Sequence, residues 1–88
     1  MSNYIFFEDA GHGWLKVSKD ELKDLGILEQ ISKYSYVFKD SVYLEEDYDM
    51  NLFVGTKQKQ TGKIIKYKTV YSATSGIRNF PRFEAVQQ

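Results

Sequence analysis

Cysteine is absent from this chain, and proline and histidine each occur once. Without cysteine there is no disulfide bond, no thiolate metal ligand and no cysteine nucleophile, and we expect a reducing compartment such as the cytoplasm. A single histidine without cysteine also makes a transition-metal site an unfavourable interpretation. We therefore predict neither a metal site nor a cofactor.

Long apolar stretches are also missing. No run of about 18 apolar residues is present, and no basic region followed by an apolar one stands at the N-terminus, so we expect neither a membrane span nor a secretion signal. Hydrophobic residues still make up 42% of the 88 residues and aromatic residues 16%. These proportions are typical of a folded chain, and we predict one domain over residues 1–88.

The net charge of zero conceals a division along the chain. Residues 1–54 carry eleven acidic and five basic side chains, whereas residues 55–83 carry seven basic side chains and no acidic one. Such a dipolar chain either neutralises itself in the fold or presents a charged surface to a partner. The seven basic residues are Lys57, Lys59, Lys63, Lys66, Lys68, Arg78 and Arg82.

Strands are predicted where aromatic and β-branched residues alternate, and helices where apolar residues recur at helical spacing. Ser18 and Glu21 have the spacing of a capping box, and Gly26 is a good helix stop. The fold class is α+β: an antiparallel sheet of four to six strands with one or two short helices on one face. The predicted strands are 3–8, 14–17, 34–38, 42–46 and 63–72, and the predicted helical segments are about 19–25, 28–32 and 47–54.

Three further segments are less regular. Residues 55–62 contain no large apolar residue and are predicted to form a mobile loop, and residues 73–76 a turn. Pro81 argues against a central strand over 77–86. That segment is expected to be an edge strand or an extended wrap that inserts two phenylalanines.

His12 stands between two glycines in a turn predicted over 9–13. One interpretation is a general base that meets Glu45 or Asp47 in a pocket. The other is a turn histidine that hydrogen-bonds the backbone or packs on Trp14. Because no nucleophile motif such as G-x-S-x-G is present, we predict that the protein is not an enzyme.

Residues 45–49, EEDYD, place four carboxylates within five positions. One interpretation is an acidic helix start whose charge is compensated by the lysines of the 63–72 strand. A second is a surface that docks on a basic partner. A third is a Mg²⁺ or Ca²⁺ site, although the spacing of a calcium loop is missing. On the partner hypothesis, replacing all four by amides abolishes binding and leaves the melting temperature nearly unchanged. The predicted partner-binding residues are Glu45, Glu46, Asp47, Tyr48 and Asp49.

The basic segment alternates with aromatic residues, a mixture that suits single-stranded nucleic acid. However, Tyr67 and Tyr71 lie opposite Lys66 and Lys68 on the predicted strand and are expected in the core. The sequence pI of about 6.6 also opposes the usual basic footprint. Nucleic-acid binding by the seven basic residues is therefore the alternative hypothesis.

Residues 80–83, FPRF, allow two interpretations. Bulky rings beside an arginine at a strand end suit β-augmentation or a homodimer. The same residues suit a tail that closes the core. Both interpretations stay open from the sequence.

Several short motifs lie in the first 55 residues or so: GHGWLKV at 11–17, then Leu22, LGI at 25–27, ISxYSY at 31–36 and YLEEDxD at 43–49. Together they resemble a pattern found in small uncharacterised proteins of bacteriophages and plasmids. The resemblance implies an accessory protein of a mobile element in the bacterial cytoplasm. It further implies binding to a host protein complex that the protein inhibits or modulates, as anti-CRISPR and other counter-defence proteins do. It transfers no catalytic residue.

Overall fold

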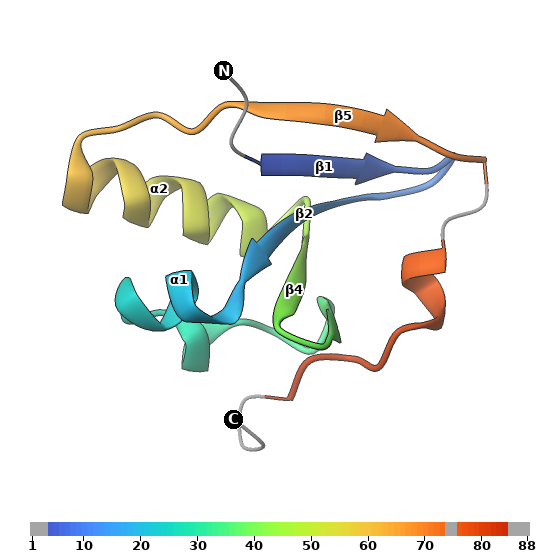
Figure 1. Cartoon of the computed structure of the whole chain (residues 1–88), viewed down its shortest axis with the longest axis horizontal. Helices are drawn as coiled ribbons and strands as arrows, with labels where there is room; N and C mark the ends of the chain where they lie inside the picture. Colours follow the sequence, from blue (N-terminus) through green and yellow to red (C-terminus); the bar gives the residue numbers. More distant parts are fainter. Residues whose placement is uncertain (1–3, 74–75, 85–88) are drawn as a thin grey trace.

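The computed structural model describes residues 4–73 and 76–84. The predicted strand start at Asn3, positions 74–75 of the predicted turn and the predicted segment beyond residue 84 lie outside them. One sheet has the strand order β3-β4-β2-β1-β5 (Figure 1). Its strands are β1 Tyr4–Glu8, β2 Gly13–Ser18, β3 Tyr36–Phe38, β4 Ser41–Glu45 and β5 Tyr67–Tyr71; the α-helices are α1 Lys19–Asp24 and α2 Asp49–Thr61; the 3-10 turns are η1 Leu28–Gln30 and η2 Gly76–Asn79.

The α+β class and the predicted number of strands are confirmed. The β1–β2 and β3–β4 hairpins form as predicted, and β2 joins them by pairing with β4. These three pairings are antiparallel, but β5 lies parallel to β1. The helix α2 carries the chain back across the sheet, so β5 runs in the same direction as β4. Two antiparallel pairings separate β4 from β1, so β1 shares that direction and pairs with β5 in parallel.

One face of the sheet packs against both α-helices, which confirms the prediction that the helical region lies on one face. Leu22 of α1 and Phe53 of α2 are fully buried there against Leu15 and Leu44. The local signals of α1 are also as predicted. The Ser18 hydroxyl accepts a hydrogen bond from the Glu21 N–H, and the glycine after the helix has φ of +78°.

The opposite face carries a second, smaller cluster formed by Trp14, Tyr36 and Tyr43. The C-terminal segment passes over it, first as the turn η2, which adds Ile77 to the cluster, and then as residues 80–83 (Figure 1). Phe83 is buried in the main core. The predicted extended wrap holds for residues 80–83, which close the core through Phe83, but residues 76–79 form a 3-10 turn instead.

The helix predicted over 47–54 starts near its predicted place but continues to Thr61, so the predicted mobile loop over 55–62 is wrong. Lysine and glutamine are good helix formers even without apolar neighbours. Gly62 ends the helix with φ of +73°, and its N–H donates to the carbonyl of Gln58. Lys57 forms an ion pair with Glu21, which ties the polar half of α2 to α1.

The strand predicted over 63–72 is shorter than expected, and its tyrosines are not in the core. Tyr67 is 44% exposed and Tyr71 60% exposed. The Tyr67 ring contacts Phe6 at a centroid distance of 5.4 Å, but β5 is the last strand of the sheet and has β1 as its neighbour on one side. Alternation along a sequence does not distinguish an edge strand from a central one, and this is why the prediction failed.

Candidate binding groove

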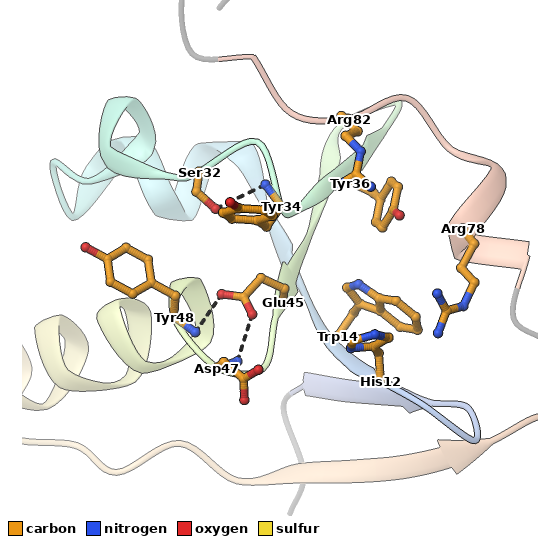
Figure 2. A pocket seen from close by; sticks show the side chains of 10 residues that line it. All are labelled: His12, Trp14, Ser32, Tyr34, Tyr36, Glu45, Asp47, Tyr48, Arg78 and Arg82. Atoms are coloured by element: carbon orange, nitrogen blue, oxygen red, sulfur yellow. Dashed lines mark hydrogen bonds between the residues drawn. The ribbon is translucent and has the colours of Figure 1, made fainter.

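A groove of about 570 Å³ opens between the start of α2 and the C-terminal segment, beside β2, β3 and β4 (Figure 2). The residues that line it come from widely separated parts of the chain. Five are aromatic in the broad sense that includes histidine, and four carry a formal charge. The lining residues are His12, Trp14, Ser32, Tyr34, Tyr36, Glu45, Asp47, Tyr48, Arg78 and Arg82.

Aromatic rings form both the base and one rim of the groove. Trp14 and Tyr36 are buried at its base, with ring centroids 6.1 Å apart in an edge-to-face arrangement. Tyr34 and Tyr48 are 62% and 68% exposed and stand on the rim (Figure 2). Exposed tyrosines beside a rigid aromatic base are the arrangement that binding hot spots favour.

The acidic side of the groove is organised by Glu45, which lies between the two rim tyrosines in Figure 2. Its carboxylate accepts hydrogen bonds from the N–H groups of Asp47, Tyr48 and Asp49, at 2.9, 2.5 and 2.8 Å. Glu45 thus satisfies orphan donors at the start of α2. The Asp47 side chain is exposed and lines the groove.

Asp49 and Glu46, the other two predicted binding carboxylates, do not line the groove. Asp49 is 0% exposed. Its Oδ2 accepts hydrogen bonds from the N–H and hydroxyl of Ser32 and from the hydroxyl of Ser35. The prediction that Asp49 contacts a partner is therefore corrected: the side chain holds the segment before β3 onto the start of α2.

The interpretation of the acidic run as internal compensation by the lysines of the 63–72 strand is not supported either. Within residues 4–73 and 76–84, no ion pair joins those lysines to residues 45–49. Lys63, Lys66 and Lys68 are exposed. The N–H groups at the start of α2 are paired instead with the negatively charged carboxylate of Glu45.

Two arginines form the opposite side of the groove (Figure 2). Arg78 lies over the Trp14 ring at 5.2 Å and donates two hydrogen bonds to the buried carboxylate of Asp9, at 2.7 and 3.1 Å. Arg82 lies over the Tyr36 ring at 5.0 Å and donates to the carbonyl of Lys33. Both guanidinium groups are thus held in place against the aromatic base.

The Asp9–Arg78 pair should make stability depend on pH. The Arg78 guanidinium, helped by the N–H groups of Gly11 and His12, holds the pKa of Asp9 well below its ordinary value. A carboxyl whose pKa is lower in the folded state stabilises the fold above its unfolded pKa, about 4, and loses that contribution as the pH falls further. The stability difference between the wild type and Asp9→Asn, measured by urea unfolding, is therefore expected to shrink steadily below about pH 4. In an Arg78→Gln background, where only the N–H groups of Gly11 and His12 remain to lower the pKa of Asp9, the same difference should change less with pH; equal pH dependence in both backgrounds would contradict the assignment.

His12 lines the same groove as Glu45 and Asp47, so the structure does bring together the three residues of the catalytic hypothesis. Among the described residues, however, no hydrogen bond joins the His12 ring to either carboxylate. The ring lies 6.2 Å from that of Trp14 between centroids. This placement matches the interpretation of a turn histidine that packs on Trp14.

The seven basic residues of the nucleic-acid hypothesis have different surroundings. Lys57 pairs with Glu21, and the two arginines stand at the groove. Lys59 is exposed on α2, while Lys66 and Lys68 lie just before and on β5. Of the seven, Lys57 is thus engaged in an ion pair and the two arginines belong to the groove, while the other four lysines are exposed.

Sequence reasoning did not mark Ser32, Tyr34, Tyr36 or Trp14 as site residues. Trp14 and the two tyrosines belong to the motifs that carry the phage and plasmid resemblance, which was the available signal. Nothing in their spacing indicated that they meet, because they stand on different elements and meet through strand pairing and the C-terminal wrap.

Comparisons with protein-family models, with curated proteins and with solved structures find no match to this chain. The resemblance to phage and plasmid proteins therefore stays a prediction. In the described part of the chain, none of the helices has the length and apolar character needed to cross a membrane. The same residues contain no group of three or more His, Asp or Glu side chains placed to hold a metal ion.

Proposed function

We propose that this protein is a non-catalytic binding module whose groove holds an extended segment of another protein. The observation that carries the proposal is the layout of the groove, in which an aromatic base and rim separate an acidic side from an arginine side. Tyrosine, tryptophan and arginine are the residues most enriched at binding hot spots. In the setting that the resemblance implies, the bound protein belongs to a host complex that the module inhibits or modulates.

Charge distribution favours a protein segment over nucleic acid as the occupant. Glu45 and Asp47 stand inside the groove and repel phosphate groups. A peptide can instead place a basic side chain near Asp47 and an acidic one near Arg82. Like charges placed against the wrong partner suppress binding, so this polarity also sets the direction of the bound segment.

The test replaces both rim tyrosines, Tyr34→Ala together with Tyr48→Ala, in a tagged protein used to capture binding proteins from bacterial lysate. Both side chains are largely exposed, so the double variant should keep the wild-type unfolding curve while its affinity for the captured protein falls at least about tenfold. Mass spectrometry identifies the captured protein, and titration calorimetry with the purified protein measures the affinity.

Ile64→Ala is the matched control, because Ile64 is 71% exposed and lies outside the groove. It should bind as the wild type does. If the double tyrosine variant binds with unchanged affinity, the groove is not the binding surface. If single-stranded DNA or RNA binds with strong salt dependence and the captured proteins do not, the nucleic-acid hypothesis replaces this one.

A further inference from the structure

The two edge strands of the sheet, β3 and β5, differ in whether another segment of the chain pairs with them. At the β3 edge, residues 81–83 continue the sheet: the Val37 N–H donates to the carbonyl of Pro81, and the Phe83 N–H donates to that of Ser35. At the other edge, every residue of β5 is exposed, and no further strand lies beside it within the described chain. In Figure 1, β5 forms the upper rim, with α2, β1 and β2 below it. The β5 edge is therefore open for pairing.

The direction of the free backbone groups follows from one hydrogen bond. The Ser72 N–H donates to the carbonyl of Glu8 on β1, so the backbone groups of residue 72 point into the sheet. Backbone groups alternate along a strand, and those of Lys68 and Val70 consequently also point toward β1. The N–H and C=O groups of Tyr67, Thr69 and Tyr71 point away from the sheet.

We infer that the open edge pairs with β5 of a second copy of this chain, antiparallel and centred on Thr69. This inference is independent of the groove. In that register Thr69 faces Thr69 of the second copy, and Tyr67 faces Tyr71. Each residue whose N–H and C=O groups point away from its own sheet therefore meets another such residue. Thr–Thr and aromatic pairs across antiparallel strands stabilise a sheet, and the two-fold symmetry makes one surface serve both copies.

The lysines near this edge select the register. Centring on Thr69 places Lys68 opposite Val70 and Lys66 opposite Ser72 of the second copy. Centring on Lys68 would place two lysines directly opposite each other, which is destabilising. Even in the favoured register, Lys66 and Lys68 of both copies lie on one face of the joined sheet. Their repulsion is screened by salt, so we expect dimerisation to strengthen as ionic strength rises.

The first test measures molar mass by light scattering over a dilution series, at about 50 mM and about 500 mM NaCl. The wild type is expected to approach twice 10.3 kDa, at lower protein concentration in the higher salt. Thr69→Pro removes an outward N–H, which an edge strand tolerates, and should weaken the dimer at least about tenfold. A wild type that stays monomeric at about 1 mM in both salts overturns the inference. So does a monomer that instead binds a glutamate-rich strand peptide, and binds it less tightly in high salt.

The second test reports the register and does not depend on the proline variant folding. Because the chain has no cysteine, Thr69→Cys introduces the sole thiol. Residues that face each other in a hydrogen-bonded antiparallel pair have Cα atoms about 5.5 Å apart, within the range of a disulfide. Thr69→Cys should therefore form a covalent dimer under mild oxidation at least about tenfold faster than Lys68→Cys, whose thiols are offset along the strands. Equal rates would overturn the register, and the Tyr34→Ala, Tyr48→Ala variant should still dimerise.

Discussion

Asp49→Ala is expected to lower the free energy of unfolding by about 3 kcal/mol. That loss is a large part of the total unfolding free energy of a chain of 88 residues. The variant removes the acceptor of three hydrogen bonds, two from Ser32 and one from Ser35. Ser35 is itself fully buried, so its hydroxyl loses a partner that water cannot replace. Urea unfolding followed by circular dichroism measures the change.

Asp47→Ala is the matched control for that prediction. Asp47 lies two positions away in the same acidic run, but its side chain is exposed. Its replacement should change the unfolding free energy by less than about 0.5 kcal/mol. If Asp49→Ala is as stable as Asp47→Ala, the buried serine network does not contribute as the geometry implies.

The buried position of Asp49 changes the expected result of replacing all four carboxylates of residues 45–49. Replacing all of them by amides was expected from the sequence to leave the melting temperature nearly unchanged. Because Asp49 is buried and Glu45 caps α2, we now expect that variant to lose stability. A binding test on this surface therefore has to use Asp47 and the rim tyrosines.

Phe83→Ala is expected to cost about 3–4 kcal/mol in unfolding free energy. Phe83 is 1% exposed in the main core, and it anchors the segment that pairs with β3. Losing the anchor should also free Arg82 from the groove and expose the Val37 N–H, which donates to Pro81. Amide hydrogen exchange is therefore expected to accelerate at Val37, while urea unfolding gives the loss of stability.

Arg82→Ala serves as the control in the same segment. The Arg82 side chain is exposed, so its loss should leave both the unfolding free energy and the exchange at Val37 close to those of the wild type. Unchanged protection of Val37 in Phe83→Ala would mean that the segment stays on β3 without its anchor, contrary to the structural argument.

Local signals in the sequence predicted most of the individual elements. The hairpins, the Ser18 cap and the stop at Gly26 depend on residues within a few positions of one another, where alternation, capping and glycine conformation act directly. The sequence did not predict that α2 continues to Thr61, because the polar second half of the helix lacks the periodic apolar residues that indicate a helix. That half is held by contacts with residues far back in the chain, such as the Lys57–Glu21 pair.

The candidate site was predicted only in part for a related reason. Glu45, Asp47 and Tyr48 were marked by their density of charge, and all three line the groove. The same density marked Asp49, since a sequence does not show whether a carboxylate will meet water or two serines. Burial is decided by which segments pack together.

By itself, the sequence determined the α+β class, the two hairpins, the first helix and the division of charge, because these depend on composition and on short-range periodicity. Only the tertiary structure decided that β5 runs parallel at an open edge, that the C-terminal segment closes the β3 edge, and that aromatic residues from three separate segments meet beside two arginines. Those outcomes depend on contacts between residues tens of positions apart. The free energy of such contacts is set by the packed arrangement as a whole and not by any local pattern.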